Sequence, residues 1–121
     1  MLDNLAQISR TVSDIEAATH WYRDVLGLTH LFSAGELAFF DMSGTRLALS
    51  QASPPQSTES ILYFQVSDID AVTASLKDHQ VEILREAQFV HRHEDGTEEW
   101  MAFFNDPDGR PLALLEQRKE K

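Results

Sequence analysis

The sequence contains no cysteine among its 121 residues. This absence excludes disulfides, thiolate nucleophiles and zinc sites with cysteine ligands, and it is typical of a reducing compartment, so we expect a cytoplasmic protein. No apolar run approaches the roughly 20 residues that a membrane-spanning helix needs. The first ten residues also lack the basic region followed by an apolar stretch that marks a signal peptide, and we therefore expect no membrane partner.

Basic residues are scarce as well. The chain has 10 Lys and Arg against 20 Asp and Glu, which gives a formal net charge of -10 at pH 7. Nucleic acids attract basic surfaces, so this balance predicts no nucleic-acid partner. Apolar residues make up 42% and charged residues 25% of the chain, the proportions of a globular protein, and the length suits one domain with a real core.

A short segment occurs twice in the chain. Residues 11–18 read TVSDIEAA and residues 65–72 read QVSDIDAV. The repeat continues in two further pairs, LAFF at 37–40 with MAFF at 101–104, and GTRLAL at 44–49 with GRPLAL at 109–114. The order of the pairs is kept while their spacing grows by about ten residues, which predicts a duplicated module with an insertion in the second copy between Leu84 and Trp100.

Each copy has the pattern of a strand, a helix and three further strands. Ser13 with Glu16 three residues later has the spacing of a capping box, which predicts a helix start, and Gly27 is a natural helix stop. Ser67 and Asp70 form a weaker pair of the same kind. The second helix is expected to end at Gln80, where a left-handed backbone would be mildly strained.

These patterns predict an α+β fold of two tandem βαβββ modules. We expect one domain over residues 1–121, with module one at about 5–51, a linker at about 52–59 and module two at about 60–117. Each module has one amphipathic helix, which covers one face of its sheet and leaves the other face open. Two such sheets facing each other would form a cleft.

The whole plan resembles the vicinal oxygen chelate (VOC) superfamily, which includes glyoxalase I, extradiol dioxygenases, fosfomycin-resistance proteins and bleomycin resistance proteins. The resemblance is carried by the paired modules, by V-S-D-I at each helix start and by FFNDPDGRPLALLE near the C-terminus, over roughly residues 5–117. It implies a glyoxalase-like (VOC) cleft of curved mixed sheets that binds a small molecule. It also implies a homodimer, because family members often complete their clefts from two chains.

The same resemblance implies where a metal would be held. In metal-dependent members up to four ligands lie in the strands, and they fall here on Gln7, Ala48, Ile61 and Ala113. Glutamine is a ligand in some glyoxalases, whereas alanine and isoleucine offer no oxygen or nitrogen donor from their side chains. We therefore expect no cofactor, and no divalent metal at the usual family site.

Strand alternation places a second set of side chains on the faces that the helices leave open. The set is largely apolar and aromatic with a few hydroxyls and amides, as in a small-molecule pocket. An alternative is that these side chains fill the space between modules or across a dimer. The candidate ligand-binding residues are Gln7, Ser9, Phe39, Ala48, Ser50, Ile61, Tyr63, Gln65, Met101, Phe103 and Ala113.

A displaced metal site is a further possibility. His91 and His93 lie on one face of a predicted strand, and a two-residue turn at Asp95 and Gly96 would set His93 opposite Glu98 and His91 opposite Trp100. Two imidazoles and a carboxylate are plausible ligands for a divalent ion. The alternatives are a hairpin insertion at 85–99 that carries polar side chains, or a flap over the pocket.

Three functions are compatible with these observations. The first is a glyoxalase/bleomycin-resistance-like protein that binds a small, largely apolar or aromatic molecule in the inter-module cleft without the usual metal site. The second is a VOC-type enzyme, lyase or dioxygenase-like, that uses a displaced divalent metal at His91, His93 and Glu98. The third is a scaffold whose pocket has closed. The sequence leaves open which of these applies, and with it whether the protein is an enzyme.

Overall fold

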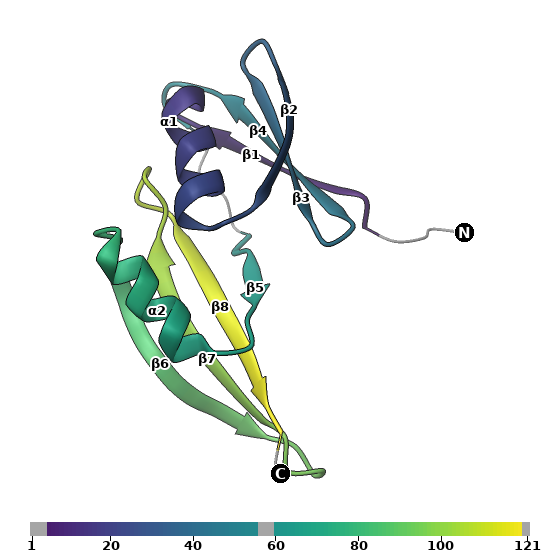
Figure 1. The fold of residues 1–121 in the computed structure, drawn as a ribbon, viewed down its shortest axis with the longest axis vertical. Helices are drawn as coiled ribbons and strands as arrows, with labels where there is room; N and C mark the ends of the chain where they lie inside the picture. The colour runs from purple at the N-terminus through teal and green to yellow at the C-terminus, as the bar shows by residue number, and fades with distance from the viewer. Residues whose placement is uncertain (1–4, 56–59, 120–121) are drawn as a thin grey trace. The chain divides into compact units, whose positions relative to one another are not determined.

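The computed structural model describes residues 5–55 and 60–119, and the chain divides into two compact units at residues 58 and 59 (Figure 1). Part of the predicted linker, residues 56–59, lies outside the described residues. Each unit contains one four-stranded mixed sheet and one helical segment. The predicted α+β fold of two tandem βαβββ modules is therefore confirmed.

The first unit consists, in chain order, of β1 (Gln7–Val12), α1 (Ile15–His20), η1 (Trp21–Val25), β2 (Thr29–Ala34), β3 (Leu37–Met42) and β4 (Thr45–Gln51). Its strands lie in the order β1-β4-β3-β2, with β1 parallel to β4 and the other neighbours antiparallel. The segment η1 is a π-helical continuation of α1. This unit therefore follows the strand–helix–three-strand plan expected from the sequence.

The second unit consists of β5 (Tyr63–Gln65), α2 (Ile69–Asp78), β6 (Ile83–Arg92), β7 (Glu98–Asn105) and β8 (Pro111–Arg118). The strand order β5-β8-β7-β6 repeats the first unit, with β5 parallel to β8 and α2 lying across one face (Figure 1). Strand β6 has 10 residues where its counterpart β2 has 6, so the inserted residues lengthen a hairpin. No helix in residues 5–55 and 60–119 is long and apolar enough to cross a membrane.

Both helices begin one residue later than the capping-box spacing predicts. Asp14, rather than Ser13, is the first N-cap, and its Oδ1 accepts a hydrogen bond from the Ala17 backbone N–H at 3.1 Å. Asp68 does the same for α2, accepting from Ala71 at 3.1 Å. A carboxylate both satisfies an open N–H group and interacts favourably with the helix dipole, so the aspartate is the better cap.

A side chain from the last strand of each unit also reaches the helix start. The Gln51 side-chain oxygen accepts from the Ile15 N–H at 2.9 Å, and Glu116 Oε1 accepts from the Ile69 N–H at 2.6 Å. Glu116 is buried with 6% of its surface exposed. Each helix is thus fixed to the last strand of its own unit by an equivalent contact, which the sequence patterns alone do not reveal.

The core of each unit lies between its helix and one face of its sheet. In the first unit Tyr22 is fully buried, with its ring centroid 6.0 Å from that of Phe40. In the second unit α2 buries Ile69 and Leu76 against its own sheet. Arg10 is buried on the same side of β1 as Val12, the side that faces the helix. The strand residues of these two cores are Val12, Ala38, Phe40, Leu47, Leu49, Ala102, Phe104, Leu112 and Leu114.

The two helices end differently although the units are copies. Gly27 follows the first helix with φ +73°, a left-handed conformation that glycine adopts without strain. Gln80 holds the corresponding position after α2 with φ +61°. The strain expected from the sequence at this helix end is therefore present in the backbone.

Replacing Gln80 with glycine should stabilise the protein. A non-glycine residue in the left-handed region costs about 1 kcal/mol, so we expect Gln80→Gly to raise the free energy of unfolding by about that amount. Urea denaturation measures this difference. Gln80→Ala is the matched control, because it removes the side chain without relieving the backbone, and it should leave the midpoint nearly unchanged. A glycine variant no more stable than the alanine variant would contradict the prediction.

Candidate functional site

The open face of the first sheet carries the predicted residues in regular rows. The strand register places Ser9 beside Ala48, and Ala48 beside Phe39, so these three side chains cross the sheet together. Ser50 lies one row further along β4, paired with Thr11 on β1. Ser9 is exposed, Phe39 and Ser50 are half-buried, and Ala48 is buried at 6% exposure.

An arginine that sequence reasoning missed lies on this same face. Arg46 pairs with Gln7 in the register, and its Nε donates a hydrogen bond to the Gln7 side-chain oxygen at 2.8 Å. Its guanidinium carbon also lies 4.9 Å from the ring centroid of Phe39 and 6.0 Å from that of Phe32. The sequence alone could have placed Arg46 on the open face, because Arg46 is two residues before Ala48 and side chains two residues apart in a strand lie on the same face.

The open face of the second sheet repeats the pattern with more aromatic surface. Its central row runs through Tyr63, Ala113, Phe103 and Arg85 on four adjacent strands. The Tyr63 and Phe103 rings make an edge contact with centroids 6.0 Å apart. A pocket of about 310 Å³ is lined by Leu84, Arg85 and Phe103. Tyr63 is 49% exposed, so this row presents aromatic surface that the core of the unit does not use.

The remaining candidates flank this central row. Gln65, Leu115 and Met101 form the next row, with Gln65 exposed and Met101 half-buried. Ile61 lies two residues before β5 begins at Tyr63, and it is half-buried. The register therefore brings most of the predicted residues of the second unit together on one face, with Ile61 at the start of the segment that leads into it.

The residues at the family's metal positions do not fit a divalent ion. Ala48, Ile61 and Ala113 carry only hydrocarbon side chains and offer no donor atom. The one donor, the side-chain oxygen of Gln7, already accepts a hydrogen bond from the Arg46 guanidinium. The positively charged guanidinium, whose Nε lies 2.8 Å from that oxygen, would repel a metal cation. Both the electrostatics and the number of donor atoms are therefore unsuited to a divalent ion at these positions.

The β6–β7 hairpin differs from the predicted pairing. Arg92 lies opposite Glu98 and His91 opposite Glu99, so the register with His93 opposite Glu98 is wrong. The turn is longer than two residues, because the His93 N–H donates to the Thr97 carbonyl at 2.8 Å. The longer turn and an irregularity between Phe89 and His91 shift the two strands past each other.

The proposed ligands of a displaced metal site have other partners. Glu98 forms an ion pair with Arg92 and accepts from the Trp100 indole N–H at 3.0 Å. His93 Nε2 is 2.7 Å from Glu99 Oε2, so this imidazole pairs with a different carboxylate. Within residues 5–55 and 60–119, no group of three His, Cys, Asp or Glu side chains is placed to hold a metal ion. His91, His93 and Glu98 are therefore not assembled as a metal centre.

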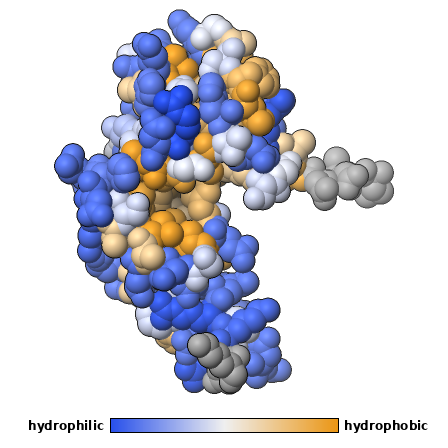
Figure 2. All heavy atoms as spheres, in the orientation of Figure 1, coloured by the Kyte–Doolittle hydropathy of each residue, from blue (hydrophilic) through white to orange (hydrophobic). Residues whose placement is uncertain are grey.

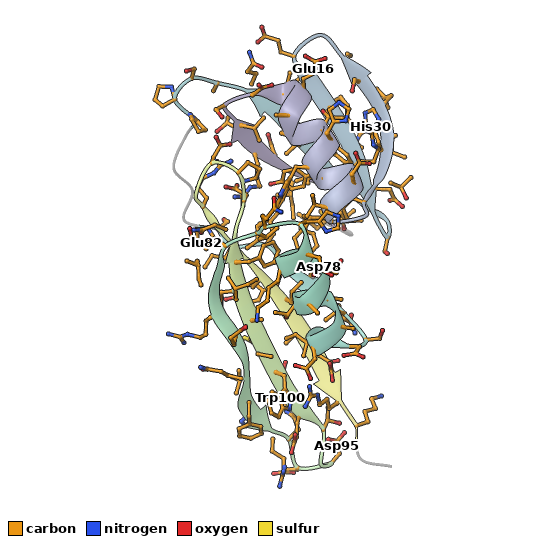
Figure 3. The ribbon with its side chains drawn as sticks, turned by 60° about the vertical axis from the view of Figure 1, so that its left-hand side comes forward. Glu16, His30, Asp78, Glu82, Asp95 and Trp100 are labelled. Atoms are coloured by element: carbon orange, nitrogen blue, oxygen red, sulfur yellow. The ribbon has the colours of Figure 1, made fainter. Side chains whose placement is uncertain are left out.

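A charged network stabilises the turn end of this hairpin instead. The Arg118 guanidinium lies 4.1 Å from the ring centroid of Trp100, hydrogen bonds to Glu116 at 2.5 Å, and reaches Asp70 at 3.2 Å. Figure 3 shows Trp100 on the hairpin, near the turn that carries Asp95. The hydrogen bond to Glu116, together with the negative charges of Glu116 and Asp70, holds the pKa of Arg118 above its usual range. These contacts connect α2, β7 and β8, and they indicate a structural role.

Glu98 gives a pH-dependent signature of this arrangement. Hydrogen bonds from Arg92 and Trp100 hold the pKa of Glu98 below its ordinary value of 4.5. A depressed carboxyl pKa contributes stability that is present above pH 4.5 and is lost as the pH falls through the lower folded-state value. Carboxyl-detected NMR titration should give Glu98 a midpoint below 4.5, and Arg92→Gln should raise it. A midpoint at or above 4.5 in the unmodified protein would show that these bonds do not form in solution.

Comparison with known proteins gives a consistent family. A family model described as the Glyoxalase/Bleomycin resistance protein/Dioxygenase superfamily matches residues 4–114. Metallothiol transferase FosB of Staphylococcus epidermidis is 31% identical over 121 residues, which covers 94% of this chain and 84% of that protein. The uncharacterized protein YaeR of Escherichia coli is 45% identical over 56 residues, with 46% of this chain and 40% of that protein covered.

Solved structures extend the likeness at the level of the fold. The genomically encoded fosfomycin resistance protein FosX of Listeria monocytogenes superimposes with a TM-score of 0.75 at 20% sequence identity. The superposition covers 96% of this chain and 94% of that one. At 20% identity, this structural similarity shows a shared fold and nothing about function.

Proposed function

The chain belongs to the Glyoxalase/Bleomycin resistance protein/Dioxygenase superfamily, and we propose that it binds a small, largely apolar or aromatic molecule without a metal at the usual family positions. The observation that carries the proposal is the composition of the open faces. At the positions where metal-dependent members of the family carry metal ligands, this chain has Ala48, Ile61 and Ala113. The fourth position, Gln7, has a donor oxygen, but that oxygen is hydrogen bonded to Arg46.

The chemistry of the open faces suits a flat organic molecule. In the central row of each sheet an aromatic ring lies beside a buried alanine, Phe39 next to Ala48 and Phe103 next to Ala113. Stacking against such rings is favourable for planar ligands, and burying their apolar area adds to it. Ser9 and Gln65 supply neutral hydrogen-bonding groups along the same faces.

Binding of aromatic probes to metal-free protein tests this function. Protein treated with chelator and desalted is titrated with benzamide and indole while amide NMR spectra are recorded. We expect shifts centred on the open-face residues of β4, β7 and β8, with a binding constant unchanged when Mn²⁺ or Zn²⁺ is added. Probes that bind only after metal is restored would contradict the proposal, as would the absence of any open-face shift up to the solubility limit of the probes.

We also propose that the protein forms a homodimer through exposed apolar side chains. Strand β6 is an edge of its sheet and exposes Leu84, Phe89 and Val90, each at 49–51% of its surface. The edge strand β2 exposes Leu31 and Phe32, and Figure 2 shows apolar side chains gathered over that strand. Exposed apolar edge strands are liabilities that soluble proteins usually cover, and a second copy of the chain would do so.

Light scattering in solution tests the homodimer. The expected mass is twice the 13.7 kDa of one chain, and Phe89→Lys should shift it toward one chain by placing a charge at the β6 edge. His91→Lys adds the same charge to the same strand without removing an apolar side chain, so it serves as the control. An unmodified protein that stays at 13.7 kDa at high concentration would rule the homodimer out.

A further inference from the structure

Most arginines of this acidic chain are neutralised by carboxylates, but the two on the open faces are not. Ion pairs join Arg23 to Asp24, Arg92 to Glu98, Arg110 to Asp106 and Arg118 to Glu116. Neither Arg46 nor Arg85 forms an ion pair with any carboxylate among residues 5–55 and 60–119. In a chain with twice as many acidic as basic residues, two unpaired arginines on the candidate binding faces are unexpected.

The Arg46 guanidinium is held in a defined position by neutral groups. Its Nε is bound to Gln7, and its planar group lies near the rings of Phe39 and Phe32, which are themselves stacked with centroids 4.5 Å apart. Arg46 is exposed, so the two terminal nitrogens of its fork remain accessible to a ligand. A guanidinium that is fixed without being neutralised is prepared to bind an anion, because little rotamer freedom is left to lose.

The contact to Arg46 also fixes the orientation of the Gln7 amide. Nε–H of arginine can only donate, so the group of Gln7 that faces it must be the carbonyl oxygen. The amide nitrogen of Gln7 then points away from Nε with two N–H donors, and the side chain is exposed. Gln7 and Arg46 therefore both present N–H donors on this face, and the Gln7 oxygen that lies between them is engaged by Arg46 Nε.

We propose that the ligand of the open face is an organic anion, a small planar or aromatic carboxylate, whose oxygens bind Arg46 and whose apolar body lies against the half-buried Phe39. This inference rests on the proposed small-molecule function and names the class of its ligand. A carboxylate matches the arginine fork in two parallel hydrogen bonds, and the adjacent ring favours a flat body. Arg46 thereby supplies the positive charge on a face where the metal donors are missing.

An acidic residue is the cross-strand neighbour of Arg46. Asp41 lies opposite Arg46 in the strand register, but its Oδ1 accepts from the Gly44 N–H at 3.1 Å in the β3–β4 turn. The turn directs one oxygen of this carboxylate to Gly44, and its negative charge remains. Asp41→Asn keeps that acceptor and removes the charge, so it should bind anions at least as tightly as the unmodified protein.

Titration with benzoate tests the proposal, with benzamide as its neutral counterpart and inorganic phosphate as an oxyanion without an apolar body. NMR of the metal-free full chain follows the Arg46 Nε–H signal. Benzoate should shift this signal and bind more tightly than benzamide or phosphate, with affinity that falls as salt is raised. Arg46→Gln should weaken benzoate about tenfold or more and leave benzamide unchanged.

Two further variants separate this idea from its alternatives. Gln7→Glu would place a carboxylate against Arg46, and it should abolish benzoate binding although the arginine remains. Arg85→Gln, on the other sheet, should leave the Arg46 response intact. If benzamide and benzoate bind equally, the anion preference is wrong while the small-molecule function stands. If neither benzoate nor benzamide binds, the anion preference and the small-molecule function are both wrong. If phosphate binds as tightly as benzoate, the ring of Phe39 does not contribute to binding. If only Arg85→Gln abolishes benzoate binding, the site does not include Arg46.

Discussion

Replacing Phe104 with alanine should destabilise the protein by about 3–5 kcal/mol, the cost of removing a fully buried ring and leaving a cavity. Phe104 is 1% exposed on the helix-facing side of β7, whereas its neighbour Phe103 is half-buried on the open face. Phe103→Ala should therefore cost clearly less stability while weakening the binding of aromatic probes. Urea denaturation and probe titration, applied to both variants, measure the two effects separately.

The adjacent pair makes this a matched comparison, because both substitutions remove the same ring from consecutive positions of one strand. The first unit offers a second comparison, since Phe40 is fully buried and Phe39 faces the open side. Equal losses of stability at Phe103 and Phe104 would show that the second sheet has no open face in solution. That result would favour the interpretation in which these residues only fill space.

The second large effect is expected at Glu116. This buried carboxylate accepts from the backbone N–H of Ile69 at 2.6 Å and holds Arg118 at 2.5 Å. Glu116→Ala removes a charged acceptor and leaves a buried helix N–H without a partner, so we expect a loss of about 2–3 kcal/mol in the free energy of unfolding. Hydrogen exchange at the Ile69 amide should increase at the same time, which places the loss at the start of α2.

The duplicated module provides the control for this prediction. Gln51 makes the equivalent contact to Ile15 with a neutral amide, so Glu116→Gln should keep the helix contact and retain most of the stability. Gln51→Ala should cost less than Glu116→Ala, because its contact is exposed and uncharged. If Glu116→Gln were as damaging as Glu116→Ala, the ion pair with Arg118 rather than the helix contact would carry the effect.

Much of the fold could be predicted because the chain repeats it. Because the pattern occurs twice, each strand and helix can be predicted from two copies of the sequence. Alternation in strands such as β1 and β7 then assigns most side chains to one face of the sheet or the other. The helix starts were placed one residue early, because serine and aspartate are adjacent at 13–14 and 67–68 and only the geometry shows which one caps. The strained Gln80 was foreseen from the glycine at the matching position in the first copy.

The candidate site could be predicted only in part. Alternation and the family resemblance identify the positions where donors are missing, since this requires only residue identity. The role of Arg46 depends on a contact between side chains on separate strands, and no pattern in one strand reports that its guanidinium meets Gln7. The predicted pairing of His93 with Glu98 is wrong because it assumes a two-residue turn, whereas the turn bonded from His93 to Thr97 shifts the register.

The central claim is that this member of the superfamily binds an organic ligand without the family's metal. The most direct measurement is the affinity of the full chain for benzoate before and after complete metal removal, with metal content determined by mass spectrometry on the same samples. The account predicts no stoichiometric divalent ion in either sample and the same affinity in both. A stoichiometric ion whose removal abolishes binding and whose return restores it would contradict the account.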